Sequence, residues 1–258
     1  MVAHTQLPEN FDLNRAIELA ELSNLAYAQY KAFTEKQSWQ LPAPYSLELV
    51  LDAVYENDNT PLGFIAKANN DIYIVWRGTQ DIEEWIEDAK YDQTPCSFLN
   101  KGEKVALGFD EMYTTGDSKV SSPQRKVLEY LNKIPLGSYT NLWITGHSLG
   151  GALAVLNTCD IVHNTAHHGA KMYNFAGPRA GDGNFANTFN NSVSLSWRIV
   201  NSHDAVPNLP PEYCPPILHT YHYEHVNQAF PISFGNSWDL VKDHSIDGYI
   251  STLKALLS

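Results

Sequence analysis

The chain has 258 residues, 43% hydrophobic and 18% charged, which is typical of a globular protein with a sizeable core and excludes a disordered chain. Its formal net charge of −12 argues against nucleic acid as a partner and against docking on strongly anionic membranes. Three cysteines, Cys96, Cys159 and Cys214, allow at most one disulfide and lack metal-type spacing, so a disulfide scaffold is excluded.

The N-terminal segment, residues 1–10, has neither a basic stretch nor an apolar core. The sequence therefore predicts no signal peptide and a cytoplasmic protein, although a chain that begins after a cleaved signal would look the same. No apolar run reaches transmembrane length. The oligomeric state does not follow from the sequence.

Hydrophobic periodicity predicts an amphipathic helix at 11–30, and a loop with two prolines follows at 37–45. Two strands are expected at 62–68 and 72–76, joined by a polar turn at 69–71 that is typical of a β-hairpin. A short helix is expected at 81–89. Asp81 is its candidate cap, and Ile82, Trp85 and Ile86 lie on its apolar face.

The second half of the chain alternates strands and helices. A helix starts at Ser122–Pro123, strands are expected at 171–176 and 197–200, and 219–225 with 229–234 form a late hairpin. A helix from about 245 to 257 closes the chain. This order predicts a mostly parallel sheet with helices on both faces. Without repeats or linkers, 1–258 is expected to form a single domain.

A strand–turn–helix pattern surrounds the motif Gly146–His147–Ser148–Leu149–Gly150. The apolar run 142–144 enters the motif, and an apolar helical pattern leaves it. In so tight a turn Gly146 and Gly150 face each other, so a β-carbon on either would clash. The turn exposes the hydroxyl of Ser148 above the sheet edge, as a nucleophile elbow requires. The alternative is a Gly/Ser turn that matches by coincidence.

A serine nucleophile needs a base to take its proton and a carboxylate to orient that base. In this architecture the acid and then the histidine follow the serine along the chain. Asp204 is the favoured acid because its loop follows the strand predicted at 197–200. Asp182 is the rival, since it also follows a strand, whereas Asp160 lies on or just after the helix that follows Ser148 and should point away.

The choice of base stays open on spacing alone. His244 stands in a loop before the last helix, where a base is needed, but His219, His222 and His225 on the predicted hairpin are alternatives of similar weight. The ring of His147 is expected to diverge from the hydroxyl of Ser148.

The segment 146–154, GHSLGGALA, resembles the signature of the class 3 (fungal-type) lipases of the α/β-hydrolase superfamily. Other stretches are similar to that family's pattern and occur in its order: VWRGT at 75–79 with Trp85–Ile86, Gly108–Phe109 with Tyr113, FAGPR at 175–179 with Gly181 and Phe185, RIVN at 198–201 with Asp204, His225–Val226, and HSIDGYI at 244–250. The resemblance covers about 62–250. It implies the α/β-hydrolase fold and a triad of Ser148, Asp204 and His244. Many members of that family have a histidine at the position of Ala106. The local packing or hydrogen-bond contact of that histidine is therefore not expected in this chain.

An ester hydrolase must also hold the negative oxygen of its tetrahedral intermediate. The backbone N–H of Leu149, directly after the nucleophile, and that of Thr79, in the loop after an early strand, are the expected donors. In the lipases that this chain resembles, a short helix follows that loop as a lid, so Ile82, Trp85 and Ile86 are expected to cover the site. The alternative is a fixed surface helix packed on the core.

These features predict a carboxylic ester hydrolase of the triacylglycerol lipase type that forms an acyl-enzyme and needs no metal or organic cofactor. Its expected partner is a lipid or ester substrate, at a lipid–water interface. The alternatives are a phospholipase A1 or galactolipase, a feruloyl-type esterase, and an inactive hydrolase fold that binds another protein. Acyl-chain and head-group preference do not follow from the sequence.

Overall fold

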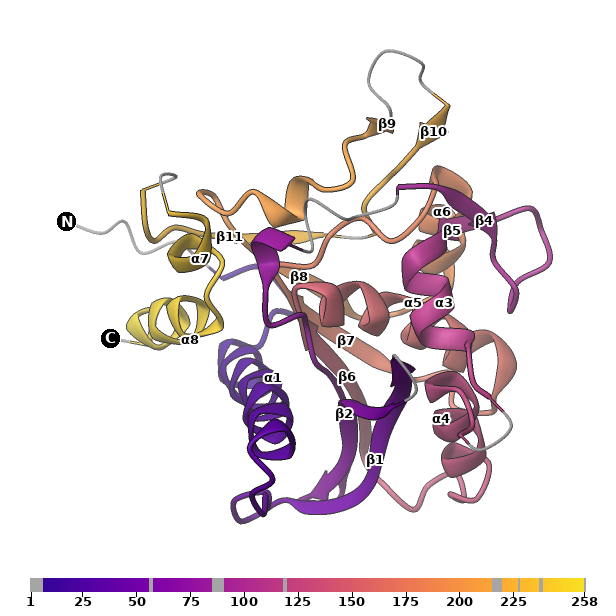
Figure 1. Ribbon diagram of the computed structural model, residues 1–258, viewed down its shortest axis with the longest axis vertical. Coiled ribbons are helices and arrows are strands. Elements are labelled where there is room, and N and C mark those ends of the chain that lie inside the picture. The colour runs from indigo at the N-terminus through magenta and orange to yellow at the C-terminus, as the bar shows by residue number, and fades with distance from the viewer. Residues whose placement is uncertain are drawn as a thin grey trace.

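The fold is built around one seven-stranded sheet, as the computed structural model shows for residues 7–55, 58–84, 91–117, 120–214, 220–226, 228–236 and 239–257 (Figure 1). Its strands, in spatial order, are β1 (Ser46–Tyr55), β2 (Asp58–Ala68), β3 (Asp71–Trp76), β6 (Asn141–His147), β7 (Lys171–Phe175), β8 (Ser196–Asn201) and β11 (Ala229–Ile232). β2 pairs antiparallel with both β1 and β3, and every pair from β3 to β11 is parallel. The expected mostly parallel sheet is therefore confirmed.

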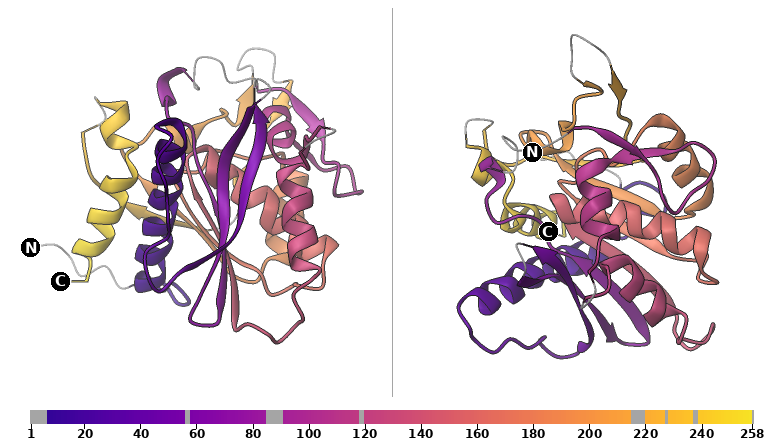
Figure 2. Two further views of the ribbon diagram at one scale, coloured as in Figure 1. Left: turned by 60° about the horizontal axis from the view of Figure 1, so that its bottom comes forward. Right: turned by 45° about the vertical axis from the view of Figure 1, so that its right-hand side comes forward.

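Helices cover both faces of this sheet (Figure 2). The first face carries α1 (Leu13–Thr34) and α8 (Ile246–Ala255), which contact each other. The second face carries α3 (Leu107–Thr114), α4 (Pro123–Leu131), α5 (Leu149–Asn164) and α6 (Gly183–Ser192). Each face buries its own apolar cluster, and α5 is buried from Leu149 to Val162 because it is enclosed between the sheet and α3 and α6. Among the described helices none is long and apolar enough to cross a membrane.

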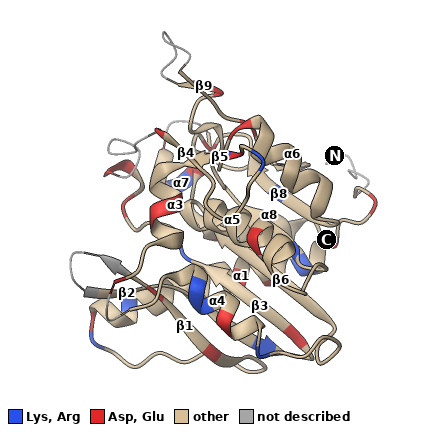
Figure 3. Ribbon diagram, turned by 90° about the vertical axis from the view of Figure 1, so that its right-hand side faces the viewer, with Lys and Arg blue, Asp and Glu red and all other residues tan. Residues whose placement is uncertain are grey.

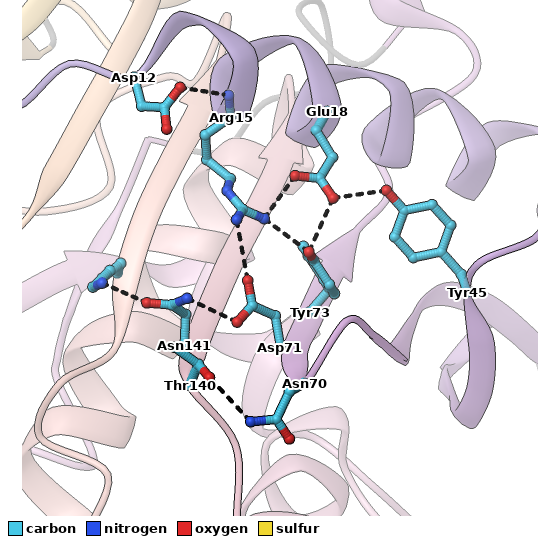
Figure 4. Close-up of polar contacts among 10 residues, drawn as sticks. Asp12, Arg15, Glu18, Tyr45, Asn70, Asp71, Tyr73, Thr140 and Asn141 are labelled. Carbon is cyan, nitrogen blue, oxygen red and sulfur yellow. Dashed lines mark hydrogen bonds and ion pairs between the residues drawn. The ribbon is translucent and has the colours of Figure 1, made fainter.

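A polar network ties α1 to the edge of the sheet where β3, β6 and β7 begin (Figure 4). Arg15 bridges Glu18 at 2.6 Å and Asp71 at 3.1 Å. Asn141 then donates to Asp71 at 2.7 Å and accepts from Lys171 at 2.7 Å. This edge is opposite the one at which the chain turns at Ser148, so the network stabilises the fold away from the motif.

The hairpin between β2 and β3 is confirmed, with Asn69 and Asn70 in the left-handed region at φ 48° and 64°. The Ser122 cap is also confirmed, since its side chain accepts from the N–H of Arg125. The first helix extends to Thr34, and the last ends at Ala255.

The predicted hairpin of 219–225 with 229–234 is wrong. β10 (Tyr221–His222) pairs with β9 (Tyr213–Cys214), while β11 joins the main sheet in parallel with β8. Alternation over a few residues identifies a strand but not its partner, and here the partners precede both segments in the chain. His219 lies outside the described residues.

The remaining elements were not expected from the sequence. They are β1, α3, α6, the β4–β5 hairpin (Gln93–Pro95 and Lys104–Ala106), the 3-10 turn η1 (Val206–Asn208) and α7 (Leu240–Asp243). Ala106 ends β5 and donates its N–H to Ala180 at 3.0 Å. This backbone hydrogen bond fixes the position of Ala106, where the lipases that the chain resembles often have a histidine.

Candidate active site

Ser148 occupies a strained turn between β6 and α5, with φ 60° and ψ −130°. A β-carbon on Gly146 would lie 2.1 Å from the carbonyl oxygen of Gly150, and one on Gly150 would lie 2.3 Å from that of Trp76. Both distances are far inside van der Waals contact, so the expected need for glycine at the two positions is confirmed. Strain of this kind persists only where the surrounding structure enforces it, and it is concentrated at functional sites.

Asp204 and His244 lie 40 residues apart in sequence and meet in the interior. Their side chains form a bond of 2.8 Å between Oδ2 of Asp204 and Nδ1 of His244. Asp204 follows β8 and His244 follows α7, and they are only 3% and 5% exposed. The carboxylate is held further by the N–H of Val206 at 2.9 Å and the hydroxyl of Tyr249 at 2.8 Å. Burial and the neighbouring Asp204 raise the pKa of Tyr249 well above its ordinary value, so this hydroxyl stays a donor.

Two atoms expected to react are buried without a hydrogen-bond partner in the described part of the chain: Oγ of Ser148 and Nε2 of His244. Most buried polar atoms in folded proteins are bonded, so each exception calls for an explanation. Here one atom belongs to the expected nucleophile and the other to the expected base. Neither is engaged by another described residue.

The rival residues are occupied by other contacts. Asp182 caps α6 by accepting from the N–H of Phe185 at 2.8 Å, and Asp160 accepts from the hydroxyl of Tyr113 at 2.8 Å. His222 faces Glu212 at 3.7 Å.

The ring of His225 lies 2.6 Å from the carbonyl of Pro207, to which it donates from Nε2. Burial, with Arg198 and Arg179 nearby, lowers the pKa of His225 to about 3. This histidine therefore stays neutral in the fold and already uses Nε2, the nitrogen that His244 leaves unbonded.

The expected oxyanion donors, Thr79 and Leu149, line one cavity of about 420 Å³. Its described lining is Tyr30, Ala53, Thr60, Leu62, Arg77, Thr79, Gln80, Asp81, Glu84, Glu111, Met112, Thr115 and Leu149. The buried members are Leu62, Arg77 and Leu149, whereas the carboxylates Asp81, Glu84 and Glu111 are exposed. The cavity thus buries two leucines and one arginine and has an acidic rim.

Arg77 secures the strand end that carries Thr79. Its guanidinium donates to the carbonyl of Gly78 at 2.6 Å and to that of Pro61 at 3.0 Å, and it stacks 4.0 Å from the ring centroid of Tyr30. Burial lowers the pKa of Arg77. These contacts hold the loop after β3 against β2 and α1.

Only the start of the expected lid helix lies within the described residues. Asp81 accepts from the N–H of Glu84 at 3.0 Å, so it caps a helical turn as predicted. Ile82 is 8% exposed and therefore packs inward. Trp85 and Ile86 lie outside the described residues.

Sequence reasoning missed three residues that support this site. Tyr249 lies within the stretch 244–250 that resembles the family, and its helical spacing from Ile246 and Leu253 could have indicated an inward side chain. Tyr27 lies on α1 and contacts His147 at 2.8 Å. Asn201 ends β8 and donates to the carbonyl of Asp243 at 2.8 Å. Asn201 lies in the stretch 198–201 that resembles the family, whereas no local signal identifies Tyr27.

A mostly parallel sheet with helices on both faces and a serine at a strand–turn–helix junction defines the α/β-hydrolase fold. Solved lipases share it. The Rhizomucor miehei lipase propeptide complex aligns with a TM-score of 0.68 at 23% identity, over 90% of this chain and 79% of that one. The mono- and diacylglycerol lipase of Aspergillus oryzae aligns with a TM-score of 0.68 at 22% identity, over 91% and 85%.

Residues 73–214 match the family described as Lipase (class 3), and the chain therefore belongs to the class 3 lipases. Phospholipase A1-Igamma3, chloroplastic, of Arabidopsis thaliana is 27% identical over 80% of this chain and 45% of its own length. Phospholipase A1-II 1 of Oryza sativa subsp. japonica is 30% identical over 66% and 49%. The chain thus spans about half the length of the curated relatives it matches.

Proposed function

We propose that this chain is a serine hydrolase that cleaves the acyl esters of glycerolipids. The observation that carries the proposal is the buried bond of 2.8 Å between Asp204 and His244, with Nε2 of His244 and Oγ of Ser148 left unbonded among the described residues. A base oriented by a carboxylate and a nucleophile on a strained turn are what acyl transfer requires. Membership of the class 3 lipases supports the same chemistry.

In the proposed reaction Ser148 attacks the ester carbonyl while His244 takes its proton. Asp204 keeps Nδ1 of His244 protonated and stabilises the imidazolium that forms. The N–H groups of Leu149 and Thr79 bind the oxyanion, a contribution worth about 3–4 kcal/mol per donor. His244 then protonates the leaving alcohol, and water activated by the same base releases the fatty acid.

The cavity beside Thr79 and Leu149 supports a substrate with an apolar part, because Leu62 and Leu149 are buried in its lining. The segment after Thr79 forms one wall of this cavity through Asp81 and Glu84. We therefore place the lid in this segment, as an element that governs access to the ester. A rate jump above the solubility limit of a short triacylglycerol is the expected sign of its movement, and smooth saturation would favour the fixed helix.

Two head-group classes are candidates. The triacylglycerol type follows from the resemblance of the sequence, and the phospholipase A1 type is supported by the names of the relatives at 27–30% identity. The acidic rim at Asp81, Glu84 and Glu111, on a chain of net charge −12, should repel an anionic head group. Figure 3 shows acidic positions on α3, which contributes Glu111, and both signs of charge on α4. A neutral or zwitterionic lipid is therefore the expected substrate.

The test is hydrolysis of dispersed triacylglycerol, phosphatidylcholine, phosphatidylglycerol and galactolipid by the wild type and by Ser148→Ala. The wild type should release fatty acid from the neutral or zwitterionic lipids faster than from phosphatidylglycerol. Ser148→Ala should fold normally and lose ester turnover. Undiminished turnover in this variant would refute the assignment of the nucleophile, and failure of a fluorophosphonate to label the wild type at Ser148 would support a non-catalytic binding protein.

A further inference from the structure

His147, the residue directly before the proposed nucleophile, makes two hydrogen bonds that hold no substrate. The ring is 3% exposed. Nε2 lies 2.8 Å from the main-chain carbonyl oxygen of His244, and Nδ1 lies 2.8 Å from the hydroxyl of Tyr27. A carbonyl can only accept, so Nε2 carries the proton. In a neutral ring Nδ1 must then accept, and the hydroxyl of Tyr27 donates to it.

The surroundings keep both groups in these forms. Burial lowers the pKa of His147 well below its ordinary value, and the nearby His244 acts in the same direction, so the ring stays neutral. Burial also raises the pKa of Tyr27, so its hydroxyl remains a donor. His147 is therefore a fixed tautomer with both nitrogens engaged, and it is not available as a base.

Tyr27 connects this pair to the loop of the oxyanion donor. A β-carbon on Gly78 would lie 2.1 Å from the hydroxyl oxygen of Tyr27, which places that oxygen directly against the main chain next to Thr79. The same β-carbon would lie 2.7 Å from the carbonyl oxygen of His147. The loop after β3, the first helix and the elbow thus converge at His147.

The main chain of the base is held at two consecutive carbonyls. Asn201, at the end of the strand that leads to Asp204, donates to the carbonyl of Asp243 at 2.8 Å. His147, beside the nucleophile, donates to the carbonyl of His244. The base follows α7, a helix of only four residues, so these contacts with β8 and β6 compensate for weak local support. One contact sets the position of the base relative to the acid, and the other sets it relative to the nucleophile.

We propose that His147 is a positioning residue that holds the main chain of His244 at the distance from Ser148 that proton transfer requires, an inference that rests on the proposed function. The side-chain bond to Asp204 orients the imidazole but leaves it free to move with its backbone. A displacement of about 1 Å at a reacting group can cost about 100-fold in rate. Loss of the His147 bond should therefore reduce kcat without weakening the binding of a small ester.

The test uses two variants of His147 whose side-chain amides take the places of different nitrogens of the imidazole ring. In His147→Gln the side-chain nitrogen reaches the position of Nε2 and can still donate to His244. In His147→Asn the shorter amide reaches only the position of Nδ1, so the contact with Tyr27 survives and the bond to His244 is lost. His163→Asn, at the far end of α5 where the ring contacts the carbonyl of Cys159 at 2.9 Å, is the matched control.

Turnover of p-nitrophenyl butyrate, a soluble ester, is measured per active serine counted with a fluorophosphonate. His147→Asn should lose about 10- to 100-fold in kcat with KM within about twofold, His147→Gln should stay within about threefold of the wild type, and His163→Asn should match it. A kcat of His147→Asn equal to that of the wild type would overturn the inference, as would equal losses in the Asn and Gln variants. If His147→Asn does not fold, Tyr27→Phe, which removes the donor to Nδ1 together with the hydroxyl that lies against Gly78, should still lower kcat, and an unchanged kcat there would count against the inference.

These outcomes are distinct from failure of the proposed function. If the wild type and Ser148→Ala hydrolyse the ester equally slowly, the proposed function fails. If the wild type is active and only the His147 ranking is absent, the positioning role alone fails.

Discussion

Replacing Tyr249 with Phe removes one oxygen that serves both the proposed acid and the fold. The hydroxyl donates to Oδ2 of Asp204 at 2.8 Å and accepts from the N–H of Asn201 at 3.0 Å, and the residue is fully buried. A bond to a charged group contributes about 1.5–3 kcal/mol, and an N–H left buried without an acceptor costs about 1–3 kcal/mol. Because one group makes both contacts, we expect a combined loss of about 2–4 kcal/mol in the free energy of unfolding.

Tyr223→Phe is the matched control. Tyr223 is also fully buried, but its hydroxyl donates to the neutral carbonyl of Tyr91 at 3.0 Å, so the expected loss is about 1 kcal/mol. At about 2–4 °C per kcal/mol for a chain of this size, Tyr249→Phe should lower Tm by roughly 5–15 °C and Tyr223→Phe by roughly 2–4 °C.

The same pair separates stability from catalysis. In Tyr249→Phe, Asp204 keeps its bonds to His244 and to the N–H of Val206 but loses the second of the two contacts at Oδ2, so we expect kcat on a soluble ester to fall about tenfold. Tyr223→Phe should retain the wild-type kcat. Calorimetry and turnover per labelled serine measure the two effects. Equal Tm losses in the two variants, with kcat intact in both, would show that the hydroxyl of Tyr249 does not support Asp204.

Three further predictions concern the elbow, the titration of a buried histidine and the opposite edge of the sheet. Gly146→Ala should destabilise the fold by about 3 kcal/mol or more, because its β-carbon would lie 2.1 Å from the carbonyl oxygen of Gly150; Gly169→Ala, with no atom within 4 Å, should change the urea midpoint little. His225 has a pKa of about 3 in the fold, so below about pH 6.5 the unfolded chain takes up a proton that the folded chain does not, and stability falls with decreasing pH. His225→Gln should therefore lose about 2 kcal/mol less than the wild type between pH 7.5 and pH 5, as measured by urea unfolding at both pH values. Asp71→Ala should cost about 2 kcal/mol in unfolding free energy and leave ester turnover unchanged, because its partners lie at the far edge of the sheet.

The elbow could be predicted from the sequence because its constraints are local. Two glycines, a serine, a short apolar run and an apolar helical pattern all lie within 14 residues, and each has a physical reason to be there. The choice of Asp204 as the proposed acid followed from a strand that ends at a loop, since the carboxyl ends of parallel strands lie at the same end of the sheet. The contact between Asp204 and His244 follows from that logic together with the family resemblance.

Contacts between distant segments could not be predicted. The partner of Ala229–Ile232 is β8 and not the segment just before it, because burial beside Phe11 and Trp197 decides the pairing and leaves no local pattern. Tyr27 is one of several aromatic residues on a helix that is buried along much of its length, and its bond to His147 spans 120 residues. Asn201 lies in a stretch that resembles the family, but its contact with the carbonyl of Asp243 spans 42 residues and leaves no local pattern.

The supporting contacts share one feature, which is that they stop short of the atoms proposed to react. Both carboxylate oxygens of Asp204 are bonded, Nδ1 of His244 is bonded, and two consecutive carbonyls at 243–244 are bonded. Nε2 of His244 and Oγ of Ser148 have no hydrogen-bond partner among the described residues, as is also true of five other buried side-chain atoms. A buried polar atom without a partner costs stability, so the two that belong to the proposed nucleophile and the proposed base call for an explanation. Rigid support around two free atoms is the arrangement expected of a preorganised site, in which the substrate supplies the missing contacts.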